Sequence, residues 1–112
     1  MNGSAPVLEV VHIAECPNWA DTAQDLRDLL AELGHADIAV GVRRVVSGDD
    51  ALAVGFAGSP TVLIDGVDPY PHGEPTGDLA CRVYLTEVGL RGRPSRTQLR
   101  QLLVERITPA TS

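Results

Sequence analysis

The two cysteines are the residues whose type and placement could do chemistry. Cys16 follows a short apolar run, Val7–Ile13, and precedes Pro17, a residue favoured at the first position of a helix. A thiol at a helix N-terminus faces unpaired backbone N–H groups and the positive end of the helix dipole, which stabilise its thiolate. This placement predicts a reactive thiol, either a nucleophile or a ligand for a soft metal. A small buried hydrophobic residue is the alternative, since that is the usual state of a free cysteine.

The second cysteine, Cys81, lies 65 positions further on and follows a proline-rich segment, 67–79. A loop of this length is uncommon in a compact domain and is more often functional than a simple connection. If it folds back over the Cys16 end of the sheet, the two sulfur atoms meet and Cys81 can resolve a mixed disulfide formed on Cys16. The alternative is a buried cysteine within a strand. A disulfide would need Cα atoms within about 7 Å of each other, a distance that the sequence does not specify.

Length and composition predict one globular domain over residues 1–112, with its core at about 7–107. Hydrophobic residues make up 44% of the chain against 21% charged residues, and the net charge is -6. This negative balance and the absence of a basic tract argue against nucleic-acid binding, which depends on cationic side chains. Residues 51–64 form the longest uncharged stretch and are too short to span a bilayer. The first residues lack the pattern of a secretory signal, so we expect a cytoplasmic protein whose cysteines are thiols by default.

The spacing of apolar residues predicts an α/β order. Residues 7–13 are typical of a central strand covered on both faces, and helical spacing follows over about 17–33. Further strands are expected at 38–46, 61–65 and 82–86, a short helix at 47–56, and a last helix that begins after Ser95. We expect the last helix to bury Leu99, Leu102, Leu103, Val104 and Ile107. The order predicts a mixed four-stranded sheet with helices on both faces.

The segment Gly58-Ser59-Pro60-Thr61 adds a more specific pattern. A proline at the start of a strand has no N–H to give the sheet, and Ser-Pro bonds can be cis. With Cys16 after the first strand and Pro60 before the third, the chain resembles the thioredoxin superfamily over Val7–Ile107. The resemblance implies a thioredoxin-like fold, Cys16 as the attacking thiol and Pro60 beside it. It also implies that the Ser59 backbone can pair with an extended thiol substrate.

The chain departs from that superfamily at Trp19, which stands where the second cysteine of the redox dithiol is expected. Its segments Cys16-Pro17-Asn18, Gly58–Thr61 and Cys81-Arg82-Val83-Tyr84 are similar to those of small single-domain thioredoxin-like proteins, some of which are labelled alkylmercury lyase. The catalytic residues expected from these patterns are Cys16, Pro60 and Cys81. The substrate-binding residues expected are Pro17, Asn18, Trp19, Ser59 and Thr61.

Three functions are compatible with these residues. The first is thiol–disulfide exchange with a protein or a small-molecule thiol or disulfide, without a cofactor. The second is capture of a soft metal or an organomercurial by Cys16 and Cys81, because thiolates favour such metals. Cleavage of a carbon–mercury bond would also need a proton donor, for which the nearest acids are Asp21, Asp65 and Asp68. The third is a non-catalytic binding module that has lost its dithiol. The sequence specifies no oligomeric state.

The three histidines, His12, His35 and His72, show no ligand spacing with each other or with the cysteines. We therefore interpret His12 and His35 as packed or solvated residues and expect no structural zinc site. His72 lies in the proline-rich loop and is the histidine that merits a test.

Overall fold

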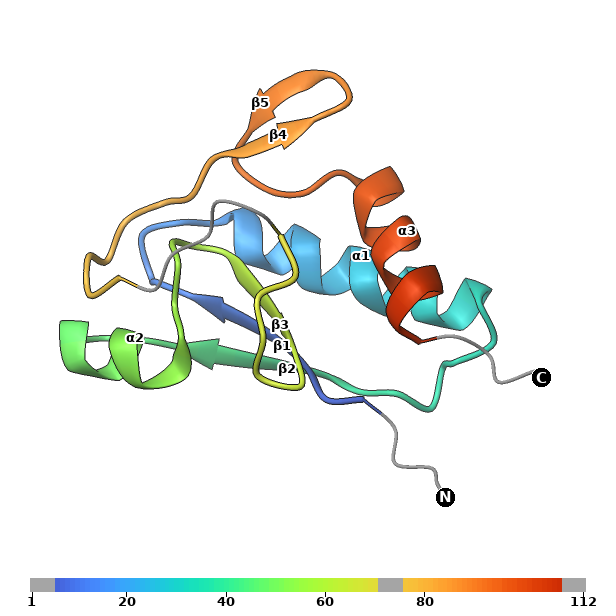
Figure 1. The fold of residues 1–112 in the computed structure, drawn as a ribbon, viewed down its shortest axis with the longest axis horizontal. Coiled ribbons are helices and arrows are strands. Elements are labelled where there is room, and N and C mark those ends of the chain that lie inside the picture. Colours follow the sequence, from blue (N-terminus) through green and yellow to red (C-terminus); the bar gives the residue numbers. More distant parts are fainter. Residues whose placement is uncertain (1–5, 71–75, 108–112) are drawn as a thin grey trace.

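The computed structural model describes residues 6–70 and 76–107. In chain order the elements are β1 (Leu8–His12), α1 (Asn18–Glu32), β2 (Val40–Arg44), α2 (Gly48–Val54), β3 (Thr61–Ile64), β4 (Tyr84–Thr86), β5 (Gly89–Arg91) and α3 (Arg96–Arg106). Figure 1 shows α1 and α3 on the same side of the sheet formed by β1, β2 and β3. The β4–β5 hairpin stands apart from this sheet, at the top of the view. The first five elements follow the expected β–α–β–α–β order.

The main sheet has three strands in the order β2-β1-β3. β1 is central, as expected, and pairs in parallel with β2 and antiparallel with β3. In this register Val10 lies between Val42 and Val62. The sheet is therefore mixed, and the loop that carries Cys16 leaves it from the end of its central strand.

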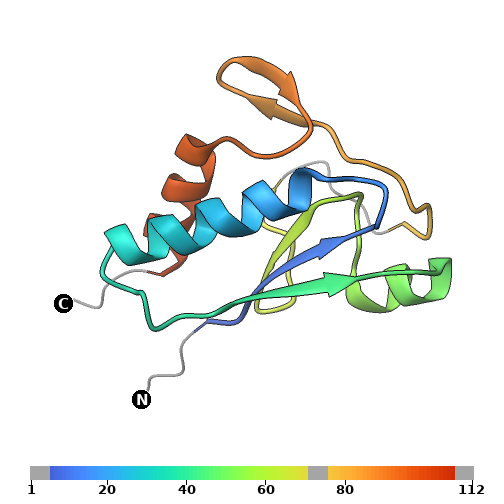
Figure 2. The ribbon, with the colours of Figure 1, turned by 180° about the vertical axis from the view of Figure 1, so that it is seen from behind.

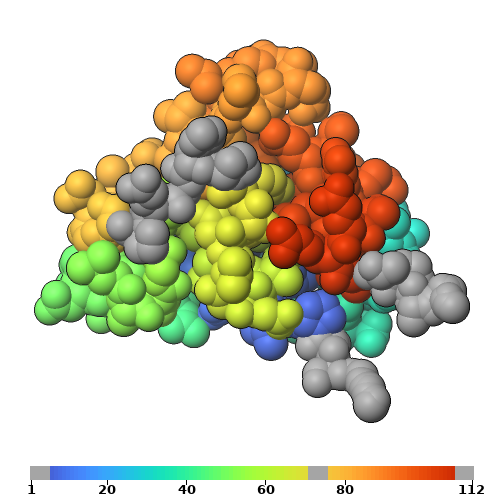
Figure 3. Space-filling view, in the orientation of Figure 1, coloured from blue at the N-terminus to red at the C-terminus, as the bar shows by residue number. Residues whose placement is uncertain are grey.

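The expected four-stranded sheet is wrong. The segment predicted as a fourth strand, 82–86, instead contributes β4 to a separate two-stranded sheet with β5. The reason is local: Gly89 adopts a φ of 107°, a conformation that L side chains rarely take, and reverses the chain directly after β4. Thr86 Oγ1 accepts from the Val88 N–H and donates to the Gly89 carbonyl, which fixes this turn. In the space-filling view the hairpin forms one edge of the molecule (Figure 3).

Two hydrophobic clusters lie on the two faces of the sheet. Because successive side chains of a strand point to opposite faces, Leu8 and Val10 belong to one cluster and Val11 to the other. The first cluster is covered by α1 and α3, which lie side by side over the strands (Figure 2). The second contains Cys16, and α2 contributes Ala51 to it. α1 and α3 thus cover one face of the sheet, whereas α2 contributes only Ala51 and the half-buried Val54 to the cluster on the other face.

Side-chain caps define where α2 and α3 begin. The Ser47 side chain accepts from the Asp50 N–H at the start of α2. At α3, Ser95 and Gln98 form the expected reciprocal capping box. α3 is also held to α1 by ion pairs in which Asp25 and Glu32 meet a set of arginines: Arg93, Arg96 and Arg100. No helix in the described ranges combines the length and apolarity needed to cross a bilayer.

The buried stripe of α3 is narrower than expected. Leu99, Leu102, Leu103 and Ile107 are buried, but the Val104 side chain is 49% exposed. At about 100° per residue, Val104 points about 140° away from Leu99 and about 160° away from Leu102, so it lies on the side of α3 that faces away from these buried residues.

We predict that Leu103→Ala lowers the free energy of unfolding by about 2–5 kcal/mol, because it leaves a cavity in the cluster between α1 and α3. The neighbouring Val104→Ala is the matched control and should change it by no more than about 0.5 kcal/mol. Urea denaturation followed by circular dichroism measures both values. Equal losses would contradict the placement of α3.

Candidate thiol–disulfide site

Cys16 lies between the end of β1 and the start of α1. Its side chain is fully buried, and it packs in the cluster that contains Val11, Ile13 and Phe56. Pro17 occupies the N-cap position of α1 and no side chain caps the helix. No side-chain acceptor therefore bonds to the N–H groups of the first turn of α1, the turn that follows Cys16. The helix-terminal placement expected from the sequence is confirmed, but the side chain is enclosed by its neighbours.

Cys16 and Cys81 are joined by a disulfide, with their Cα atoms 6.1 Å apart. This separation lies within the usual range for a disulfide. In contrast to Cys16, Cys81 is exposed. The sequence suggested that Cys16 and Cys81 could meet if the loop before Cys81 folded back, and the two cysteines are indeed neighbours. Cys81 is not a buried strand cysteine. The 65-residue separation between them closes a loop that contains most of the described fold.

Backbone hydrogen bonds place Cys81 at this position. The Ser59 N–H donates to the Ala80 carbonyl at 2.9 Å, and the Arg82 N–H donates to the Ser59 carbonyl at 2.8 Å. Ser59 and Cys81 thus form an isolated parallel bridge beside the main sheet. The pairing expected between Ser59 and an extended substrate is made here by the chain itself.

The residues around Pro60 are buried and have internal partners. The Ser59–Pro60 peptide bond is cis. The Ser59 side chain accepts from the Ile13 N–H, which links this segment to the end of β1. Thr61 is also fully buried, and its hydroxyl accepts from the Ala57 N–H and donates to the Gly58 carbonyl. In this state neither Ser59 nor Thr61 offers a free polar group to a substrate.

A buried clamp of three side chains, Asp68, Arg82 and Tyr84, holds the Cys81 segment against the sheet. Arg82 donates to Asp68 at 2.6 Å, and both side chains are almost entirely buried. The Arg82 guanidinium also lies over the Tyr84 ring, 4.5 Å from its centroid. The Tyr84 hydroxyl in turn donates to the Pro60 carbonyl. Because Arg82 and Tyr84 are two residues apart in an extended segment, both point inward, on either side of the exposed Val83.

Gly58 allows this segment to lie close to the sheet. Its φ is +106°, and a Cβ at this position would lie 2.7 Å from Arg82 Cβ. Only glycine therefore permits both the backbone conformation and the approach of Arg82. Sequence reasoning grouped Gly58 with the Ser59-Pro60-Thr61 pattern but assigned no role to Gly58, Arg82 or Tyr84. The sequence does contain a signal for the roles of Arg82 and Tyr84, because both residues lie within three positions of Cys81.

Two tyrosines, Tyr70 and Tyr84, lie at this clamp, and burial raises the pKa of each above the ordinary value of about 10. For Tyr70, the Asp68 carboxylate adds to the effect of burial, while Arg82 opposes it. For Tyr84, Arg82 opposes the effect of burial and Asp68 adds to it. The two rings meet edge to face, with centroids 5.5 Å apart. Among the described atoms the buried Tyr70 hydroxyl has no hydrogen-bond partner.

The remaining expected substrate-binding residues lie at the start of α1. Pro17 is exposed, whereas Asn18 and Trp19 are half-buried. The Trp19 ring stacks on His12, with ring centroids 4.2 Å apart, and packs against the α1–α3 cluster rather than the cluster of Cys16. His12 is buried and its Nδ1 bonds to the Ile13 carbonyl, as expected for a packed histidine. His35 is half-buried, and His72 lies outside the described residues.

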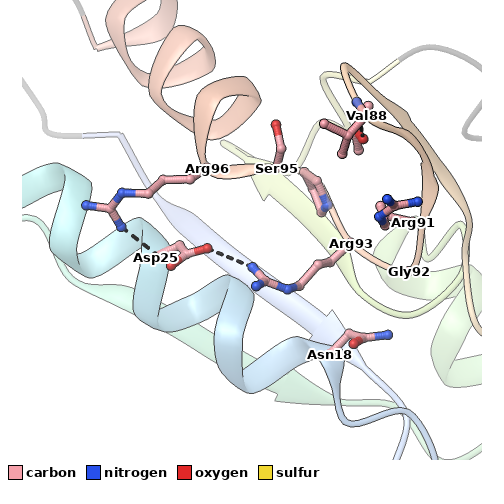
Figure 4. A pocket seen from close by; sticks show the side chains of 10 residues that line it. Asn18, Asp25, Val88, Arg91, Gly92, Arg93, Ser95 and Arg96 are labelled. Carbon is pink, nitrogen blue, oxygen red and sulfur yellow. Dashed lines mark hydrogen bonds and ion pairs between the residues drawn. The ribbon is translucent and has the colours of Figure 1, made fainter.

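Two cavities flank the hairpin. One of about 500 Å³ lies between α1, the hairpin and the start of α3, and its Arg93 and Arg96 side chains point at Asp25 (Figure 4). These ion pairs account for two of its three arginines. The other has a volume of about 560 Å³, and its lining includes Tyr70, Arg82, Val83 and Leu90. The second cavity lies closer to the disulfide in sequence, since Arg82 in its lining directly follows Cys81.

No group of three or more His, Cys, Asp or Glu side chains that could hold a metal ion occurs within the part of the chain that the structure describes. The acids considered as proton donors are not gathered at the sulfurs. Asp68 is paired with Arg82, Asp65 accepts from the Val7 N–H, and Asp21 is an exposed residue in the first turn of α1. The site consists of the Cys16–Cys81 disulfide and the segment that positions Cys81.

No family model, no curated protein and no solved structure matches this chain. The chemistry open to the site thus follows from its own atoms. It holds a cysteine pair that can be oxidised or reduced, with one sulfur at the start of a helix and the other on a segment fixed by hydrogen bonds.

We predict that Gly58→Ala lowers the equilibrium constant for forming the Cys16–Cys81 disulfide about tenfold, which corresponds to ~1.4 kcal/mol. The added methyl group pushes Arg82, and with it Cys81, away from Cys16. The measurement is equilibration of the protein in glutathione redox buffers, followed by alkylation of free thiols and mass spectrometry.

Gly55→Ala is the matched control for this change. Gly55 also has a positive φ, +78°, but no heavy atom lies within 4 Å of the position of the added Cβ. Both variants should lose about 1 kcal/mol of stability from the backbone conformation, but only Gly58→Ala should shift the disulfide equilibrium. An equal shift in both would contradict the close approach of Arg82.

We also predict that neither tyrosine ionises near pH 10 while the protein is folded. The folded state keeps the two phenolic protons that the unfolded state loses, so the free energy of unfolding is unaffected below about pH 10 and falls as pH rises further. The ultraviolet absorbance of phenolate should therefore rise together with unfolding, and Tyr70→Phe or Tyr84→Phe should each remove half of the rise. A reversible titration near pH 10 with circular dichroism unchanged would show that one phenol is accessible.

Proposed function

We propose that this protein is a thioredoxin-like thiol–disulfide exchange protein whose redox pair is Cys16 and Cys81. The observation that carries the proposal is the disulfide between a cysteine at the start of α1 and a cysteine fixed beside Ser59. The disulfide accepts two electrons and two protons from two external thiols, which become a disulfide. The reverse reaction oxidises external thiols and returns the pair to the dithiol state.

The arrangement of the elements supports the thioredoxin-like assignment. Cys16 lies between β1 and α1, and Pro60 directly precedes β3, as the resemblance in sequence implies. The Ile13 N–H bonds to the Ser59 hydroxyl, so the two loops meet at the same end of the sheet. The three-stranded sheet and the distant second cysteine distinguish the chain from the usual pattern. In this proposal Cys81 takes the part of the cysteine that Trp19 replaces.

A coupled assay tests the proposal. The protein is given a small disulfide substrate and glutathione as the electron donor, and the loss of the substrate disulfide is followed. We expect turnover with the wild type that passes through the Cys16–Cys81 disulfide, and a loss of about 100-fold or more when Cys16→Ser and Cys81→Ser are combined, because exchange needs a protein thiol. Each single variant should lack the intramolecular disulfide intermediate, as shown by acid quenching and mass spectrometry. Val104→Ala, an exposed position on α3, serves as the control and should retain full activity.

Two results would contradict this function. One is the absence of a Cys16–Cys81 disulfide in mildly oxidised protein. The other is a wild type that forms this disulfide but turns over no substrate. If the reduced wild type instead binds one mercuric or zinc ion tightly and shows no turnover, metal capture through the two thiolates becomes the better explanation.

A further inference from the structure

The two ends of the disulfide differ in their access to solvent. The Cys16 side chain is fully buried, and Val11, Ile13, Val45, Ala51, Phe56 and Leu63 share its cluster. Cys81 is exposed, and so are its neighbours Leu79, Ala80 and Val83. A thiolate arriving from solvent therefore meets Cys81 first and finds Cys16 behind it.

Disulfide exchange requires direct contact between the attacking thiolate and one sulfur, while the other sulfur leaves. We infer that external thiols attack Cys81, so that the mixed disulfide forms on Cys81 and Cys16 is the leaving group. This inference rests on the proposed function and reverses the roles expected from the sequence, where Cys16 attacks and Cys81 resolves. The inference identifies Cys81 as the catalytic residue that contacts the substrate.

The steps balance as follows. An external thiolate bonds to the sulfur of Cys81, the Cys16–Cys81 bond breaks, and Cys16 departs with the electron pair as a thiolate. A second external thiolate then attacks the external sulfur of the mixed disulfide. This step releases the external disulfide and leaves Cys81 as a thiolate. Both cysteines take up protons from water to the extent that their pKa values require.

The surroundings of Cys16 suit a leaving group. α1 begins two residues after it, and no side chain caps the helix, so the N–H groups of the first turn are available to negative charge that develops on the sulfur. Among thiols, one with a lower pKa leaves faster from a disulfide. In the part of the chain that the structure describes, no helix begins next to Cys81, and backbone hydrogen bonds of its neighbours Ala80 and Arg82 join it to Ser59.

The same bonds indicate which thiols can react with the oxidised protein. The N–H and carbonyl of Ser59 are both taken by the chain itself, so an extended peptide cannot add to this edge while the Cys81 segment is docked. A small thiol needs no such pairing and can approach Cys81 from solvent. The substrate class for reduction of this disulfide is therefore a small, soluble thiol.

Trapping of the mixed disulfide tests the inference. Oxidised wild-type protein is mixed briefly with limiting glutathione, quenched with acid, and alkylated with N-ethylmaleimide. The chain has no lysine, and trypsin cleavage after Arg27, Arg44 and Arg82 places Cys16 in peptide 1–27 and Cys81 in peptide 45–82. We expect glutathione on peptide 45–82 and maleimide on peptide 1–27. The reverse distribution, or an equal one, would overturn the inference.

Single-cysteine variants provide a second readout. With glutathione disulfide, Cys81 in Cys16→Ser should react about tenfold or more faster than Cys16 in Cys81→Ser, because only Cys81 is accessible. Cys16→Ala replaces Cys16→Ser if the buried hydroxyl impairs folding, as judged by circular dichroism. A faster reaction at Cys16 would overturn the inference while leaving exchange through the pair intact. By contrast, a wild type that forms no Cys16–Cys81 disulfide would remove the proposed function itself.

Discussion

The backbone pairing of Ser59 with the segment 80–82 is the interaction on which the site depends. Ser59 is fully buried, so its N–H and carbonyl must find partners within the protein. Ala80 and Arg82 supply both. The residue between these two partners, Cys81, is thereby set beside the loop that carries Cys16. Backbone hydrogen bonds on both sides of Cys81 thus act together with the disulfide to hold the two cysteines next to each other.

The side chains that follow Cys81 reinforce this pairing. Burying their charged groups costs solvation free energy, which is offset only when every charged group has its partner. A buried arginine or aspartate without its partner would lose several kcal/mol of solvation, at roughly the scale known for buried ion pairs. Arg82 has Asp68 as its partner and the Tyr84 ring beneath it, and Tyr84 bonds to the Pro60 carbonyl. None of these contacts involves sulfur. We therefore expect the segment to stay docked when the disulfide is reduced. The two thiols then remain close enough to re-form their bond.

The sequence predicted elements more successfully than the contacts between them. Strong local signals located β1, α1 and the capped start of α3, because apolar spacing and capping residues act within a few positions. They did not reveal that β4 would pair with β5 instead of the main sheet, since that choice depends on the turn at Gly89 competing with a distant strand edge. The sequence left a buried Cys16 open as the alternative to a reactive thiol, because two residues that enclose it, Val45 and Phe56, come from far along the chain.

The absence of the expected fourth strand from the main sheet and the position of Cys81 are linked. Trp19 stands where the resemblance in sequence would place a second thiol, and its ring stacks on His12, so α1 offers no sulfur to Cys16. A partner must come from another segment that passes the same end of the sheet. Residues 84–91 form the separate hairpin and do not pair with the main sheet. Just before the hairpin, Cys81 forms an isolated bridge with Ser59. Cys81 is thus held at the point where this segment pairs with Ser59, and it is exposed while Cys16 lies buried behind it.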